Sequence, residues 1–518
     1  MPPKSSCAAT TCKHESLCFT STPYAQTAGY VRPNLEQRLA AATSDGNVNP
    51  ASQSNSRSQS STKNTSQIQV DEAETKIYPA PLVLPSSEIS LYPRHQGQSL
   101  RSWLRNSHVN RITEERKTIY ISLPPEISDG VRFMRGWTVP KGERKKRSLG
   151  LDYELVAKYV GVFYHGLDVK VMPEGWFSWI QDGDEITEAK GKGKSKSRSK
   201  SKATSRSMHL DSEPDDPQIG LRSKDSDEYT VIRSRLTPNY PYSNQLNLND
   251  ILDFAIASLP NDVYALLMLV EHDLYEDEED EFVCGRAYGG SRVAVVSGAR
   301  YWPGFDEEEN VERVHGWPAS HCEAHLETFL SDEEIMSTGK MKAAKSAAAD
   351  LEASKSKEFL KVTPLHRALQ VYTPPATPKA LTLLHLARLA RTASHELGHC
   401  FGIGHCTFYA CIMQGSASLA EDARQPPYLC PVDEAKVLRA TAKGMVSERR
   451  MEEWRRKRLV VMRDFCNGIV EEWGFDGRGS MFECLGKWIE GLFEVAQKGD
   501  EEGKREVERV VIDLTMDD

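Results

Sequence analysis

The chain has 518 residues, of which 39% are hydrophobic and 27% are charged, and its formal net charge is -9. This composition is too polar for one compact globule of this length, so we expect a folded core together with disordered segments. The acidic balance argues against a general nucleic-acid-binding protein. No run approaches the ~18–20 apolar residues that span a membrane, and the N-terminus lacks the apolar segment of a secretory signal peptide. We therefore expect an intracellular protein, cytoplasmic or nuclear, that is not secreted and has no membrane partner.

The chain divides into regions of different composition. Residues 1–75 are rich in Ser, Thr, Asn, Gln and Ala and are predicted to be a disordered N-terminal tail. Residues 76–445 are expected to form the folded domain, with two flexible insertions at 184–227 and 302–365. Residues 446–518 are predicted to be a helical C-terminal extension that ends in an acidic tail.

The first insertion contains a basic run over residues 190–207, without any acidic residue. Such a run cannot form a packed core. It is interpreted either as a solvated linker or as a nuclear-localisation patch that binds nucleic acid weakly.

Hydrophobic periodicity predicts a mixture of strands and helices, and therefore an α/β (α+β) fold. In chain order we expect a strand at 117–123, a helix and a strand within 155–173, a strand at 228–236, a helix at 248–260, a strand at 263–270, two strands within 283–301 and a helix at 376–402. Asn249 is the expected N-cap of the helix at 248–260, and Thr377, followed by Pro378, is that of the last helix. The strand at 263–270 is one apolar run, which is typical of a strand covered on both faces.

The end of the last helix carries the motif His-Glu-x-x-His. His395 and His399 lie one helical turn apart, so both imidazoles can reach one zinc ion. Glu396 is turned aside, where it can act on a water molecule as a general base. Gly402 can adopt the positive φ that ends the helix, which lets His405 return as a third ligand. Three protein ligands leave a fourth position open, as in catalytic zinc sites.

The residues that follow this motif point to one family. The extended motif, with Met413 as its Met-turn residue, is the metzincin signature. Together with Cys406, Cys411 and Cys430 it resembles the archaemetzincins, closely over residues 380–440 and loosely over 115–182 and 228–301. The resemblance implies a metzincin-like zinc-peptidase domain with a twisted mixed sheet, an active-site helix and a Met-turn, plus long disordered tails and insertions.

The resemblance also implies a second, structural zinc ion. Archaemetzincins hold it with four cysteines, of which Cys406, Cys411 and Cys430 match three, and the fourth position is Asp433. A carboxylate can bind zinc, so a Cys3Asp site is expected, with weaker affinity than four thiolates; alternatively the site has been lost. The spacing of the N-terminal cysteines and His14 matches no common zinc module. The remaining cysteines are interpreted as core residues or free thiols: Cys7, Cys12, Cys18, Cys284, Cys322, Cys400, Cys466 and Cys484.

The implied function is a zinc-dependent metallopeptidase, a hydrolase that acts on a peptide or protein substrate. Glu396 is its expected catalytic residue, and the three histidines are the ligands of the catalytic zinc. An antiparallel edge strand, expected within Arg292–Ser297 or its neighbour, would bind an extended peptide as an added strand. The alternative is a catalytically weak or inactive zinc-binding adaptor. Glu396 favours the enzyme, because a scaffold does not need this acid.

The C-terminal tail suggests a protein partner. Val511, Ile512, Asp513 and Leu514, followed by further acidic residues, resemble a SUMO-interaction motif, which binds by strand addition. Together with the basic run, this motif would suit a nuclear, SUMO-linked adaptor. Metalloproteases that act on DNA-bound proteins combine the same histidine motif with such tails, but they lack the cysteine arrangement described above.

Overall fold

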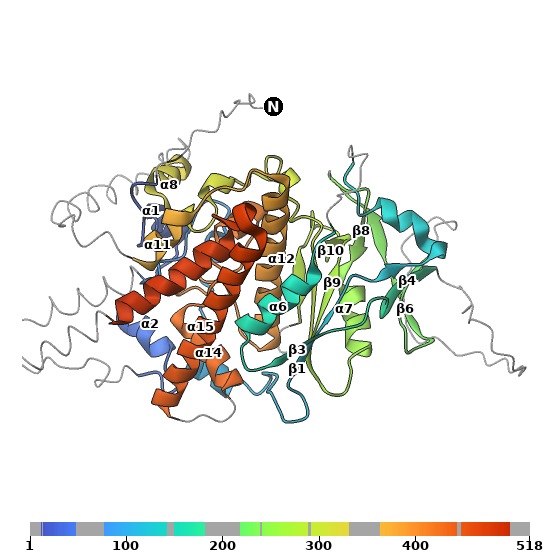
Figure 1. Cartoon of the computed structure of the whole chain (residues 1–518), viewed down its shortest axis with the longest axis horizontal. Helices are drawn as coiled ribbons and strands as arrows, with labels where there is room; N and C mark the ends of the chain where they lie inside the picture. Colours follow the sequence, from blue (N-terminus) through green and yellow to red (C-terminus); the bar gives the residue numbers. More distant parts are fainter. Residues whose placement is uncertain are drawn as a thin grey trace, which may run out of the picture.

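The computed structural model describes residues 12, 14–47, 77–141, 150–181, 218–238, 241–288, 292–330, 363–442 and 447–497. In these residues a layer of helices covers one face of a five-stranded sheet (Figure 1). One further helix and two smaller sheets cover the other face. The predicted α/β class is confirmed.

The central sheet is mixed, and an antiparallel strand forms one of its edges. In spatial order its strands are β11 (Gly285–Ala287), β12 (Val293–Ser297), β9 (Val263–Val270), β1 (Thr118–Ser122) and β3 (Asp168–Val171). All neighbouring pairs are parallel except that of β11 with β12. The antiparallel edge strand is predicted either within residues 292–297 or in the strand beside them. It is the strand beside them, β11.

Strand β9 shows why the sheet separates two cores. All of its residues are buried. Because side chains alternate along a strand, Leu267 and Leu269 join the core beneath the helices, whereas Leu266 and Met268 join the core on the opposite face. The predicted strand with two covered faces is confirmed.

Helices α6 (Tyr153–Phe163) and α12 (Pro378–Cys400) pack on the first face, and α7 (Leu248–Ala257) packs on the second. Helix α12 begins as predicted, because the Thr377 side chain accepts the backbone N–H of Ala380 at 3.1 Å. Helix α7 is capped by Asn247 instead of Asn249. The prediction is wrong because the helix begins at Leu248, which places Asn249 inside its first turn.

Two smaller sheets lie against the second face. One contains β2 (Glu126–Ile127), β4 (Phe177–Gln181), β5 (Ile219–Ser223) and β6 (Tyr229–Ile232), and the other β10 (Asp273–Tyr275), β8 (Asn244–Asn247) and β7 (Ser234–Leu236). A 3-10 helix, η2 (Asp129–Gly136), packs beside β4. The insertion predicted at 184–227 is wrong for its last residues, because Leu221 of β5 is fully buried and pairs with Trp179 of β4. The strand predicted at 228–236 is two strands, in different sheets.

Part of the N-terminal region is folded, which corrects the disorder predicted for residues 1–75. Residues 14–47 contain α1 (Pro23–Ala28) and α2 (Leu35–Ala41), and α4 (Glu88–Leu91) and α5 (Leu100–Arg105) follow. Asn34 and Gln37 form a capping box at the start of α2. The Tyr30 hydroxyl donates to the Thr407 carbonyl oxygen at 2.6 Å. The polar composition conceals these helices because their few apolar residues pack against distant parts of the chain.

The region predicted as an insertion at 302–365 is folded over residues 302–330. It contains η3 (Pro303–Phe305), η4 (Arg313–His315), η5 (Ala319–His321) and α8 (Glu323–Leu330). Trp317, Cys322 and Leu326 are buried. The prediction fails here because buried apolar residues alternate with the acidic ones. Helix α11 (Pro364–Val371) then leads to α12.

The C-terminal helices belong to the main core and are not a separate extension. They are α15 (Glu448–Trp473), the short η7 (Gly474–Gly477) and a helix over residues 481–497, and they follow α13 (Leu419–Arg424) and α14 (Pro431–Thr441) of the predicted domain. Cys466 and Trp488 are buried in the same core as α6 and α12. Figure 1 shows α15 beside α6. The predicted helical character of this region is confirmed as far as residue 497.

Several predictions concern residues outside the described ranges. These are the basic run at 190–207 and the SUMO-binding motif of Val511, Ile512, Asp513 and Leu514, and both stay predictions. Within the described ranges, no helix combines the length and the apolar character that crossing a membrane requires.

Candidate metal centres

Two histidines lie on the same side of α12 near its C-terminal end. The Nε2 atoms of His395 and His399 are 3.1 Å apart. Two nitrogens bound to one zinc ion at ~2.0–2.1 Å are expected about 3.3 Å apart. Desolvation lowers the pKa of His399 to about 4 and that of His395 well below its usual value. Both rings are therefore neutral at pH 7, which is the form that binds a metal.

Gly402 reverses the chain after α12 and brings the third histidine into place. Its φ is +73°, in the left-handed region that favours glycine. A Cβ atom there would also lie only 2.8 Å from Cγ2 of Val109. The ring centroid of His405 lies 5.4 Å from that of His395 and 5.0 Å from that of His399. The structure thus brings the three predicted ligands together, and we call this set the histidine centre.

Each ring of the histidine centre is oriented through Nδ1. In His395 and His399 this atom lies 2.6 and 2.7 Å from a backbone carbonyl oxygen. In His405 it lies 2.7 Å from Oε1 of Glu88. An Nδ1–H that donates to an oxygen leaves Nε2 with a free lone pair. Three such Nε2 atoms suit a tetrahedral metal ion with one open position.

Glu88 is a residue of this candidate site that sequence analysis misses. It lies in α4, 317 residues before His405. Gly415 leaves the space for its carboxylate, because any side chain at that position would overlap it. Glu421 accepts the backbone N–H of Glu88 at 3.0 Å and so helps to hold it. No spacing or periodicity connects Glu88 with the motif, so the sequence contains no signal for it.

Glu396 lies beside the histidine centre on the same helix. It is 7% exposed, and burial raises the pKa of its carboxyl to about 7. The carboxylate accepts a backbone hydrogen bond from Ala287 of β11. Gly285 of the same strand is also close, since a Cβ atom there would lie 3.3 Å from Cγ of Glu396. A carboxyl with this pKa can accept and return a proton near neutral pH.

The histidine centre opens into a cleft of about 550 Å³. His395, Glu396 and His405 form part of its wall, together with Gly285 and the segment 414–419. β11 lies at the end of the central sheet, and among the described strands none pairs with its outer edge. The cleft therefore combines metal-ligating nitrogens, a carboxyl group and an available strand edge.

Met413 lies beneath the histidine centre. Its side chain is fully buried, and a Cβ atom on Gly398 would lie 2.5 Å from its Sδ. Its carbonyl oxygen accepts the backbone N–H of Cys406 at 2.7 Å. Met413 thus has the packing position expected of a Met-turn residue.

A second set of four side chains follows directly in the sequence and is fully buried. Cys406, Cys411, Cys430 and Asp433 offer ligand atoms within 4.8 Å of one another. The Sγ atoms of Cys406 and Cys430 are 3.6 Å apart, close to the roughly 3.8 Å expected for two thiolates on one zinc ion. Oδ2 of Asp433 lies 3.4 Å from Sγ of Cys411. We call this set the cysteine centre.

Lys436 is a second residue that sequence analysis misses. Its Nζ lies 2.7 Å from Oδ1 of Asp433, and both side chains are 1% exposed. This ion pair leaves Oδ2 facing the thiols. It also brings a positive charge to a set of ligands that would be strongly negative when ionised, as buried charges require. The sequence does contain a signal for this ion pair, because a lysine three residues after an aspartate on a helix can reach it.

Comparisons with known proteins find similar sequences over the segment that carries both centres. The sequence model of peptidase family M54 matches residues 369–437. Archaemetzincin-2 of Homo sapiens is 28% identical over 188 residues, 36% of this chain and 40% of the human protein. The archaemetzincin of Methanopyrus kandleri is 47% identical over 47 residues, 9% of this chain and 27% of the archaeal protein. The crystal structure of that archaeal protein covers 64% of this chain and 98% of its own, with a TM-score of 0.27 and 16% identity.

The chain spans about two-fifths of the length of the mammalian relatives that it matches. The segment matched by the family model contains the complete histidine centre, Glu396, Met413 and the complete cysteine centre. These matches show that the chain is similar to the archaemetzincin family over the segment that contains both centres.

Proposed function

We propose that this protein is a zinc metallopeptidase that hydrolyses peptide bonds in peptide or protein substrates. The observation that carries the proposal is the histidine centre, which lies beside the buried Glu396 in an open cleft. The family matches support the same activity. His395, His399 and His405 are the proposed ligands of the catalytic zinc ion, and Glu396 is the proposed general base.

The donor atoms of the histidine centre fit zinc. Neutral imidazole is a common zinc ligand, and the oxygen acceptors at Nδ1 hold each ring in place. Zinc bound by these three nitrogens would polarise the scissile carbonyl group and a water molecule. The remaining steps depend on residues of the chain itself.

Glu396 and β11 would handle the proton and the substrate. The outer edge of β11 can bind an extended peptide by strand addition, which aligns the peptide backbone beside Glu396. Glu396 takes a proton from the attacking water and gives it to the amine that leaves. Burial raises the pKa of its carboxyl, which helps it to hold the proton between the two transfers.

The cysteine centre is proposed to hold a second zinc ion with a structural role. Its four ligands are Cys406, Cys411, Cys430 and Asp433, all of them buried. Four protein ligands fill a tetrahedral site and leave no position for a substrate. Lys436 supplies a cation close to this anionic set.

The alternative function, a zinc-binding adaptor without catalysis, gives an acid beside the histidines no role. Burying a carboxyl costs free energy. Glu396 is nevertheless buried against β11 beside the histidines, and this placement favours the enzyme.

Digestion of a peptide library by the wild-type protein and by Glu396→Gln tests the proposal. We expect the substitution to reduce cleavage about 10²–10⁴-fold and to leave the zinc content, measured by elemental mass spectrometry, unchanged. Glu309→Gln is a matched control, because Glu309 pairs with Arg300 outside the cleft. It should cleave like the wild type. Equal cleavage by wild type and Glu396→Gln would contradict the proposal.

A further inference from the structure

The N-terminal segment pairs with the start of α8. Leu17 and Cys322 form an antiparallel bridge. The N–H of Cys18 donates to the His321 carbonyl oxygen at 2.8 Å, and the N–H of Glu323 donates to the Ser16 carbonyl oxygen at 3.0 Å. Backbone pairing thus fixes the segment against residues that lie about 300 positions later in the chain.

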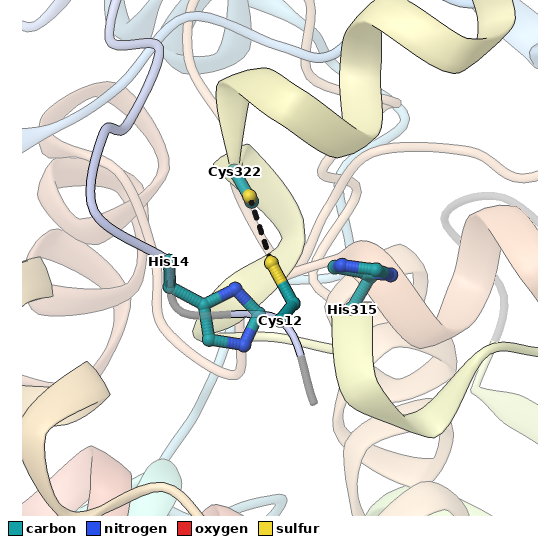
Figure 2. A group of neighbouring side chains, drawn as sticks. All are labelled: Cys12, His14, His315 and Cys322. Carbon is teal, nitrogen blue, oxygen red and sulfur yellow. Dashed lines mark hydrogen bonds between the residues drawn. The ribbon is translucent and has the colours of Figure 1, made fainter. Parts of the chain in front are cut away.

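This pairing brings four potential metal ligands together, of which three are half-buried and Cys322 is buried. Cys12, His14, His315 and Cys322 offer ligand atoms within 4.8 Å of one another. Figure 2 shows the two histidine rings and the Cys322 side chain around the thiol of Cys12. The Sγ atoms of Cys12 and Cys322 are 3.4 Å apart. This distance is too long for a disulfide bond, at ~2.05 Å, and near the roughly 3.8 Å of two thiolates on one zinc ion.

The two histidines have ring nitrogens available for a metal. Nδ1 of His315 lies 2.8 Å from Oε2 of Glu312. Nε2 is therefore the ring nitrogen that remains to bind a metal. Nδ1 of His14 is buried and has no hydrogen-bond partner among the described residues, and the ring of His315 interacts with the thiol of Cys12. Buried polar atoms normally have partners. His14 also adopts a φ of +45°, an uncommon conformation for a residue other than glycine.

We propose that Cys12, His14, His315 and Cys322 bind a structural zinc ion, separate from the histidine and cysteine centres. Two thiolates and two imidazoles form a common closed zinc site. Glu312 would accept the Nδ1–H of His315 and orient its ring, as carboxylates often do for zinc-bound histidines. This site does not depend on the peptidase activity proposed above. It reverses the interpretation of Cys12 as a free thiol, which rested on the spacing of the N-terminal residues, and that of Cys322 as a core residue or free thiol.

Another set, Glu312, His315 and His325, also lies close together, but its geometry is less suitable. The rings of His315 and His325 are stacked, with centroids 3.6 Å apart and an angle of 7° between their planes. A ring nitrogen binds a metal within the plane of its ring, so two parallel rings cannot both direct a lone pair at one ion. His315 therefore serves the set with the two cysteines.

A zinc ion bound by Cys12, His14, His315 and Cys322 would hold the N-terminal segment on the domain. We call this four-residue site the clasp. Residues 14–47 continue from the clasp to the turn that bears the cysteine centre. Tyr30 donates to the Thr407 carbonyl oxygen at 2.6 Å, and Nε of Arg32 donates to the Phe408 carbonyl oxygen at 3.2 Å. A metal ion at the clasp would keep these contacts in place over the turn between Cys406 and Cys411.

The zinc content of the full chain tests the proposal. We compare the wild type with the double variant Cys12→Ser/His14→Gln by elemental mass spectrometry after purification under reducing conditions. The double variant should contain about one zinc ion fewer and keep the others. Cys18→Ser and His325→Gln are matched controls, one for an N-terminal cysteine and one for the stacked histidine, and both should keep the wild-type content. An unchanged content in the double variant, or a loss in His325→Gln alone, would overturn the proposal.

A second measurement uses only the wild-type protein, so it does not depend on how the variants fold. Zinc at the clasp should protect Cys12 and Cys322 from alkylation by iodoacetamide until a chelator is added, as peptide mass spectrometry would show. Equal alkylation with and without chelator would overturn the proposal. A disulfide-linked peptide pair containing both cysteines, in protein purified without reductant and with zinc present, would overturn it too.

Discussion

His405 and Cys406 are consecutive residues, yet their side chains enter two sites of opposite character. The histidine centre is half-buried and lies in the wall of a cleft of about 550 Å³. The cysteine centre is closed, and none of its four residues is more than 2% exposed. The same short turn after Gly402 thus supplies one open and one closed site.

Charge separates the two centres as clearly as burial does. Three neutral imidazoles would leave the positive charge of a zinc ion available to polarise a substrate. Three thiolates and one carboxylate would more than neutralise it, and Lys436 offsets part of the negative excess. The comparison teaches that ligand charge and access, rather than the metal, decide which centre can catalyse a reaction.

Replacing one ligand in each centre should give the largest difference in stability between the two variants. Cys411→Ser should lower the free energy of unfolding by at least about 5 kcal/mol, because zinc binding to a structural site is folding free energy. His399→Gln should abolish peptide cleavage but lower stability by only about 1–2 kcal/mol, since the vacated site retains two hydrogen-bonded rings. Urea denaturation and peptide digestion measure the two effects. Similar destabilisation by both substitutions would break the comparison.

Lys436 should contribute less to the free energy of unfolding than a ligand of the cysteine centre does, but more than a lysine on the surface. Lys436→Met leaves the Asp433 carboxylate buried without its partner, which should lower stability by about 3–5 kcal/mol. Lys487→Met is a matched control, because Lys487 and Glu490 have the same spacing but side chains 38% and 34% exposed. It should change stability by less than about 1 kcal/mol. Equal midpoints of urea denaturation for the two variants would argue against charge balance in the cysteine centre.

Glu88 should affect only the histidine centre. Glu88→Gln weakens the acceptor at Nδ1 of His405 and should reduce zinc affinity there about 10–100-fold. Gly415→Ala should act in the same direction, because its new methyl group displaces the Glu88 carboxylate. Titration with a competing chromophoric chelator measures the affinity. The prediction fails if Glu88→Gln binds zinc like the wild type, or if it releases the metal of the cysteine centre first.

The sequence predicts those parts of the site that are determined by residues close together in the chain. Thr377 caps α12, the spacing of His395 and His399 follows from the helical period, and Gly402 has a required φ. Each of these features depends on residues within a few positions of one another. The continuous apolar run of β9 is likewise enough to predict a strand buried on both faces.

The sequence does not predict contacts between segments that are far apart in the chain. Tyr30 reaches Thr407 from a region whose composition suggests disorder, and Glu88 reaches His405 from a stretch in which no element is predicted. Average polarity over a window is misleading when a few buried residues fix a segment onto another surface. The same error places Cys322 in an insertion, although it is 1% exposed in the core.

The smallest effect should come from the turn that the two centres share. Gly402→Ala forces a Cβ atom into the left-handed region and towards Val109, which should lower stability by about 1–2 kcal/mol. Gly468→Ala is the control, because Gly468 lies inside α15 with no atom within 4 Å of an added Cβ, and it should stabilise the protein by about 0.5–1 kcal/mol. Since residue 402 precedes both His405 and Cys406, the first substitution should weaken zinc binding at both centres. An effect confined to one centre would show that the turn supports them independently.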